Sequence, residues 1–147
     1  MIIKKSLILE STDEKVWNYL TKFDRIQKWN ECLLEHQKVS IGEPGPGYQS
    51  RILMQEGRKN VWYNEEILEY HSQKLLKIKL SGGSLGKAPM IITYELSEIE
   101  DGVQLDYTSH WEPKGLMYKL LHGMIESASE KKVEKDLQAL KNKVENQ

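Results

Sequence analysis

The chain has 147 residues, a length that suits a single domain with its own hydrophobic core. Its 21 basic and 22 acidic residues give a formal net charge of −1, so no overall electrostatic field favours nucleic acid or an acidic membrane. Cys32 is the single cysteine, which excludes an internal disulfide and predicts a reducing, cytoplasmic location. No apolar run approaches the roughly 18 residues of a membrane span, and the start of the chain lacks signal-peptide features.

The first predicted elements are a strand and two short helices. Residues 2–10 alternate in polarity, as in a strand. Ser11 and Glu14 have the spacing of a capping box and predict a helix directly after this strand. Asp24 is expected to cap a second short helix. We interpret the large aromatic side chains of this segment as anchors that hold the helix pair against the sheet: Trp17, Phe23 and Trp29.

From Leu33 onward the apolar period is two, which indicates strands separated by turns rich in Gly and Pro. A helix is predicted from about Leu116 to about Val144. The apolar stripe of this helix is broad in its first half and narrow in its second, so we expect it to pack on a broad apolar face of the sheet. Six strands are predicted between the short helices and the long one: residues 33–41, 48–55, 60–70, 74–82, 90–99 and 103–112.

This order of elements, and the segment STDEKVWNYLTKFDRIQKWN in particular, resembles the START-like (SRPBCC) superfamily, the polyketide cyclase/dehydrase and lipid-transport group. The matching positions are a polar cap at Ser11 or Thr12, the Val16–Trp17 pair, Asp24 and Trp29. The resemblance covers nearly the whole chain and implies one domain over residues 1–147. It also implies an α+β helix-grip fold, in which a curved seven-stranded antiparallel sheet carries the long helix across its concave face. A cavity between sheet and helix is part of that layout.

The alternation of the strands predicts which side chains face this cavity. Tyrosine and tryptophan have polar tips and methionine is adaptable, so together they suit a pocket that holds an apolar ligand with a polar group. Simple core packing is the alternative interpretation for the same residues. The predicted ligand-binding residues are Tyr63, Glu65, Met90, Ile92, Tyr94, Tyr107, Ser109, Trp111, Met117, Leu121 and Met124.

Glu65 and Glu66 are adjacent in a strand, so one of them must point toward the concave face. If Tyr63, Glu65 and Ile67 share the inward face, the Glu65 carboxyl enters an apolar cavity, where burial would raise its pKa and equip it for acid/base chemistry. A bulged strand or a solvated position at the rim is the alternative. Glu65 and His122, which lies on the long helix, are the two candidates for a catalytic acid or base.

Neither a metal nor a cofactor is expected. The histidines are not spaced as metal ligands with a carboxylate partner, and we expect all four at the surface: His36, His71, His110 and His122. The segment SGGSLGKA departs from a P-loop at Ser81 and Ala88.

Three functions fit the sequence. The first is binding of a small hydrophobic or amphipathic ligand, such as a lipid, polyketide-like or isoprenoid-like molecule. The second is an enzyme of the cyclase/dehydratase or hydrolase type. The third is a chaperone- or ribosome-associated interaction module, which would present a sizeable exposed apolar patch. We expect a monomer or weak dimer with a small hydrophobic partner, no nucleic acid and no stable membrane insertion, and the sequence leaves a protein partner open.

Overall fold

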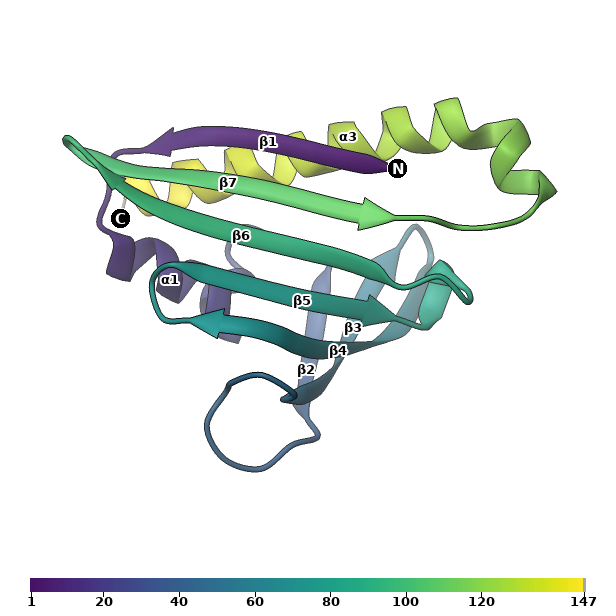
Figure 1. The fold of residues 1–147 in the computed structure, drawn as a ribbon, viewed down its shortest axis with the longest axis horizontal. Helices are drawn as coiled ribbons and strands as arrows, with labels where there is room; N and C mark the ends of the chain where they lie inside the picture. The colour runs from purple at the N-terminus through teal and green to yellow at the C-terminus, as the bar shows by residue number, and fades with distance from the viewer. Residues whose placement is uncertain (147) are drawn as a thin grey trace.

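In the computed structural model, which describes residues 1–146, seven strands form one antiparallel sheet and a long helix closes the chain (Figure 1). The strands are β1 (Ile2–Leu9), β2 (Leu33–Lys38), β3 (Gln49–Glu56), β4 (Lys59–His71), β5 (Leu75–Ser81), β6 (Met90–Ile99) and β7 (Gly102–Trp111). The helices are α1 (Asp13–Thr21), α2 (Phe23–Ile26) and α3 (Leu116–Glu145), with a 3-10 turn, η1 (Gly83–Leu85). The predicted α+β helix-grip fold is confirmed.

The sheet is strongly curved, with strand order β1-β7-β6-β5-β4-β3-β2. In Figure 1, β2 and β3 run steeply to the direction shared by β1, β5, β6 and β7, so the sheet wraps around one side of the molecule. Burial alternates along β7, where Val103, Leu105, Tyr107 and Ser109 are buried and the residues between them are more exposed. This pattern is expected when one face of an antiparallel sheet meets the core and the other meets water.

The helix caps differ from the predicted ones. Thr12 caps α1, because its hydroxyl accepts a hydrogen bond from the Lys15 amide at 3.2 Å. The predicted capping box of Ser11 and Glu14 is therefore wrong by one residue. The second helix begins at Phe23 without a side-chain cap, so Asp24 lies inside its first turn and does not cap it.

The two tryptophans of this segment are anchors, as predicted. Trp29 is buried and its indole N–H donates to the Tyr19 carbonyl at 2.7 Å, which joins the end of α2 to α1. Trp17 packs edge-to-face on Tyr70 of β4, with 5.4 Å between ring centroids. These contacts fix α1 against one end of the sheet.

Phe23 has a different neighbour, His36 of β2, whose ring stacks on it at a centroid distance of 5.9 Å. His36 is half-buried and its pKa is lowered, mainly because burial disfavours the charged ring and also because Lys38 is close. The prediction that His36 is a surface histidine is wrong, since its side chain points to the helix side of the sheet. His71 and His110 are exposed, as expected.

Only the second half of α3 packs into the core. Leu137, Leu140 and Val144 are buried in the same cluster as Leu9 of β1. Two ion pairs hold the middle of the helix to β1, because Lys5 Nζ lies 2.7 Å from a Glu130 oxygen and 2.8 Å from one of Glu134. At the helix end, the Glu10 amide donates to the Glu145 carboxylate at 2.8 Å.

The first half of α3 is placed differently from the prediction. In Figure 1 its opening turns extend past the start of β1. Met117, Leu120 and Met124 are all more than two-thirds exposed. Helical periodicity places these side chains on the side of α3 opposite to Leu137 and Leu140, which pack on the sheet. The expectation that the broad apolar first half packs on the sheet is therefore wrong.

Candidate functional site

The candidate site is the part of the concave face around Glu65. In the pairing of β4 with its neighbours, Glu65 is opposite Ser50 of β3 and Leu80 of β5. A register shift in β4 lies between Ile67 and Glu69, after Glu65, so the alternation before it is regular. Tyr63, Glu65 and Ile67 consequently share the concave face, while Glu66 points to the other face and lies 4.0 Å from Lys79.

The environment of the Glu65 carboxyl is unusual for an ionisable group. Its side chain is only partly exposed, and no hydrogen bond or ion pair to it is found within residues 1–146. Loss of hydration, with no compensating partner, raises its pKa from 4.5 to about 7. Near neutral pH the group is therefore present both as a carboxylic acid, which donates a hydrogen bond, and as a carboxylate.

Tyr94 of β6 is near enough to this carboxyl to be affected by its charge, and Tyr107 of β7 lies beside Tyr94. Tyr94 and Tyr107 are cross-strand partners whose rings meet edge-to-face at a centroid distance of 5.5 Å. Burial raises the pKa of both hydroxyls, and at Tyr94 the negative charges of Asp136 and Glu65, and of Tyr107 when it is ionised, act in the same direction. A hydrogen bond with Ser109 partly offsets this at Tyr107. Both tyrosines therefore stay neutral at ordinary pH and can donate a hydrogen bond.

Asp136 is a member of this group that the sequence interpretation missed. It comes from α3, and its charge reaches both Tyr94 and Tyr107. Lys132 Nζ lies 2.8 Å from one of its oxygens. Its position was available from the sequence, because Asp136 lies three residues after Val133 and four before Leu140, on the helix side that packs.

Tyr63 lies on the same face, but its hydroxyl is used in a contact within the protein. The hydroxyl donates to the Glu56 carboxylate, and Ser84 Oγ donates to the other Glu56 oxygen at 2.5 Å. Gly83 of η1 sits directly on the ring, because an added Cβ would lie 2.7 Å from Tyr63 Cε1. Tyr63 therefore joins η1 to the β3–β4 hairpin at one end of the concave face.

Trp111 connects the loop before β6 and the start of α3 at the same end of the sheet. Its indole N–H donates to the Ala88 carbonyl at 3.0 Å, and its ring meets Tyr118 of α3 at a centroid distance of 5.7 Å. Met90 is its cross-strand partner. Met90, Ile92, Tyr94 and Trp111 each keep some exposed surface, so this part of the concave face is accessible from solvent.

Four predicted site residues lie elsewhere. Met117, Leu121 and Met124 are exposed on the first half of α3, because that half turns them away from the sheet. His122 is also exposed, with its Nδ1 3.1 Å from the Lys119 carbonyl oxygen. The structure therefore keeps Glu65, Ile92, Tyr94, Tyr107 and Ser109 on one face of the sheet, and it separates the α3 residues from them.

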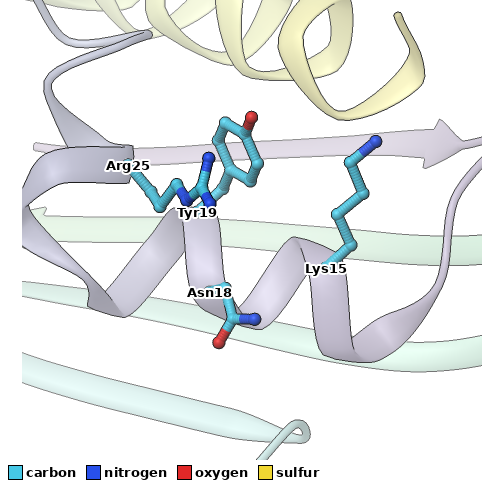
Figure 2. A pocket seen from close by; sticks show the side chains of 4 residues that line it. All are labelled: Lys15, Asn18, Tyr19 and Arg25. Atoms are coloured by element: carbon cyan, nitrogen blue, oxygen red, sulfur yellow. The ribbon is translucent and has the colours of Figure 1, made fainter. Parts of the chain in front are cut away.

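Two surface hollows are found away from this group. One has a volume of about 230 Å³ and lies at α1 and α2, between Lys15, Asn18, Tyr19 and Arg25 (Figure 2). There the Arg25 guanidinium lies 5.7 Å from the Tyr19 ring centroid. The other, of about 720 Å³, lies at the opposite end of β5 and β6 from Trp111 and includes Asp13, His71, Lys74 and Glu98. Neither hollow contains a predicted site residue.

Across residues 1–146, no group of three His, Cys, Asp or Glu side chains is placed to hold a metal ion. No helix in this part of the chain is long and apolar enough to cross a membrane.

The chain is similar in sequence to one known protein family and in fold to several solved structures. A family model described as "Polyketide cyclase / dehydrase and lipid transport" matches residues 5–145. No curated protein sequence matches significantly.

Three solved structures illustrate the structural likeness. TTHA0849 from Thermus thermophilus superposes with a TM-score of 0.77 at 16% identity, covering 98% of this chain and 97% of its own. Ara h 8.0201 gives a TM-score of 0.70 at 14% identity, with 98% and 97% covered. The Aha1 dimer from Colwellia psychrerythraea gives 0.68 at 15% identity, with 99% and 97% covered. At these identities the likeness shows the fold alone.

Proposed function

This chain belongs to the polyketide cyclase/dehydrase and lipid transport family, and we propose that it binds a small hydrophobic or amphipathic molecule on the concave face of its sheet. The observation that carries the proposal is the Glu65 carboxyl, which lies on this face with a pKa of about 7 and no protein partner in residues 1–146. Its protonated form can donate a hydrogen bond to a carbonyl or hydroxyl oxygen of the ligand.

The surroundings of Glu65 suit such a ligand. Ile92, Met90 and Leu80 offer apolar surface from neighbouring strands, and each is partly exposed. Covering this surface with an apolar ligand is favourable by about 25 cal/mol per Å². Tyr94 and Tyr107 add neutral hydroxyl groups. A lipid, a polyketide-like or an isoprenoid-like molecule with one oxygen function has this combination of an apolar body and a polar group.

The location of the ligand is tested with the uncharged fluorescent probe Nile red. Ile92→Trp fills space on the concave face and is expected to weaken probe binding about tenfold or more. Ile91→Trp is the matched control, since Ile91 is the next residue of β6 and faces the other side of the sheet. Equal affinity in the two variants would contradict binding on the concave face. Native mass spectra of gently purified protein, compared with denaturing spectra, then show whether a natural ligand is retained.

A second candidate function, acid/base catalysis, is favoured by the same carboxyl. A pKa of about 7 is close to the optimum for a general acid or base at neutral pH. Glu65→Gln separates the two functions, because the amide can still hydrogen-bond to a ligand but cannot transfer a proton. If the protein only binds its ligand, the variant keeps its affinity for the ligand and no reaction is lost. If the protein is an enzyme, the variant keeps its affinity and loses turnover of a bound cyclisable polyketide-like substrate.

The oligomeric state and the cellular location of the protein are also proposals. We infer a monomer or weak dimer, since the fold buries a core within one chain and the similar Aha1 structure is of a dimer. A cytoplasmic location is supported by the single cysteine, Cys32. Sedimentation equilibrium of the purified chain tests the first of these.

A further inference from the structure

The first half of α3 carries an exposed apolar stripe. It consists of Leu116, Met117, Leu120, Leu121 and Met124, which are between 39% and 73% exposed, and we call this set the α3 stripe. The other large apolar side chains exposed within residues 1–146 belong to β1, the loop after β2 and β6: Ile2, Ile8, Val39, Ile41 and Ile99. Single exposed apolar residues are ordinary on protein surfaces, but a contiguous patch marks an interaction site.

The direction of the α3 stripe is fixed by contacts on the other side of the helix. Tyr118 lies against the ring of Trp111, which is itself hydrogen-bonded to the Ala88 carbonyl. This contact holds the first turns of α3 to the end of β7. Met117, Leu120 and Met124 recur at intervals of three and four residues, so they line one side of the helix, turned away from Tyr118.

No acidic residue occurs between Glu112 and Glu126, and Lys114 lies two residues before the α3 stripe. Lys119 comes five full turns before Leu137, so it lies on the opposite side of the helix from Met117 and Met124. Lys131 and Lys135 follow Met124 by seven and eleven residues, so they continue the same side of the helix.

The acidic side chains of α3 are directed elsewhere or already paired. Glu130 and Glu134 bind Lys5 of β1, and Asp136 binds Lys132. Glu126 lies seven residues before Val133, on the side of the helix that packs. The outward side of α3 therefore presents an apolar segment followed by Lys131 and Lys135, and the nearest carboxylates, Glu130 and Glu134, are paired with Lys5.

We propose that this side of α3 docks onto an anionic lipid bilayer. The α3 stripe enters the boundary between headgroups and acyl chains, and Lys114, Lys131 and Lys135 lie against anionic headgroups. Charge favours this partner over a second copy of the chain, because a two-fold pairing of the α3 stripe would bring the lysines of both copies together. The surface is separate from the concave face around Glu65, so docking goes beyond ligand binding and requires no ligand.

The test is flotation of the whole chain with vesicles of phosphatidylcholine alone or with about 30 mol% phosphatidylserine. We expect binding to the anionic vesicles that weakens about tenfold or more without phosphatidylserine, or when salt is raised from about 0.1 M to about 0.5 M. Leu120→Gln/Met124→Gln should weaken binding about tenfold or more. Lys131→Gln/Lys135→Gln should weaken it by a similar factor on anionic vesicles only.

Ile8→Gln/Ile41→Gln is the matched control, because it also removes two exposed apolar side chains, from β1 and the loop after β2. It should bind as the unmodified protein does. All replaced side chains are exposed, so circular dichroism is expected to show unchanged folding in each variant. Absence of binding to anionic vesicles, or equal binding by Leu120→Gln/Met124→Gln, would overturn the proposal. So would a dimer in sedimentation equilibrium that Leu120→Gln/Met124→Gln dissociates.

Discussion

Glu65 shows how one residue can make the stability of this protein depend on pH. Its pKa is about 7 in the folded protein, against 4.5 for an ordinary glutamate. Between these values the folded protein binds a proton that the unfolded chain has released, so the free energy of unfolding falls as pH rises. The decrease is complete above about pH 7 and amounts to at most about 3 kcal/mol.

Glu65→Gln is expected to remove this pH dependence, because an amide does not ionise. From about pH 4.5 to about pH 8, the free energy of unfolding of the variant should rise relative to that of the unmodified protein by about 2–3 kcal/mol. Urea denaturation at a series of pH values measures this change in the free energy of unfolding. Glu66→Gln is the control, since Glu66 is the next residue of β4 and faces the other side of the sheet. Identical pH profiles for the two variants would mean that the Glu65 carboxyl is solvated.

The sequence predicts that Glu65 faces inward, but it does not predict the hydrogen bond that the Tyr63 hydroxyl makes. Alternation along β4 assigns both residues to one face, and this holds because the register shift comes only after Ile67. The Tyr63 hydroxyl binds Glu56, and Ser84 binds the same carboxylate. That contact depends on how the η1 loop folds back over the sheet, which no local pattern in the sequence encodes.

Among the elements, α3 has two halves with different roles in stability. Leu140 is completely buried, so Leu140→Ala should leave a cavity and lower the free energy of unfolding by about 2–5 kcal/mol. Leu120 is 70% exposed, so Leu120→Ala is expected to change the free energy of unfolding by no more than about 0.5 kcal/mol. Urea denaturation of the two variants measures the difference. Comparable losses would show that the first half of α3 packs against the sheet in solution.

Element boundaries were predicted well because they depend on local chemistry. The predicted strand over residues 90–99 coincides with β6, and the predicted helix end at about Val144 is one residue from the observed end of α3. Alternation, turn glycines and helical spacing act over a few residues and are read directly. The sequence left the cap between Ser11 and Thr12 and assigned the capping box to Ser11, because both have capping side chains and only backbone geometry decides between them.

The orientation of α3 was not predictable from its own sequence. In its first half, apolar residues occupy so wide a stripe that more than one side of the helix could meet the sheet. The choice is made by tertiary contacts, chiefly Tyr118 with Trp111 and Lys5 with Glu130 and Glu134. These pair residues far apart in sequence, so the outward position of Met117 and Met124 follows only from the assembled fold.

At the scale of the whole molecule, the difference in packing between the two halves of α3 predicts uneven protection of its amides against hydrogen exchange. Residues 133–144 are tied to the core by Leu137, Leu140 and Val144, so their amides should exchange only when the whole domain unfolds. Residues 116–124 lack buried apolar side chains and should open locally, at a small fraction of the global free energy.

Ligand and bilayer should then protect different parts of the chain. Nile red bound on the concave face is expected to slow exchange in β4 to β7 and to leave residues 116–124 unchanged, because these residues do not face Glu65. Anionic vesicles should slow exchange in residues 116–124, because the lipid boundary excludes water from this half of α3. Mass spectrometry of peptides from each segment measures both effects. If Nile red also protected residues 116–124, this half of α3 would close over the concave face on binding, and the two surfaces would be coupled.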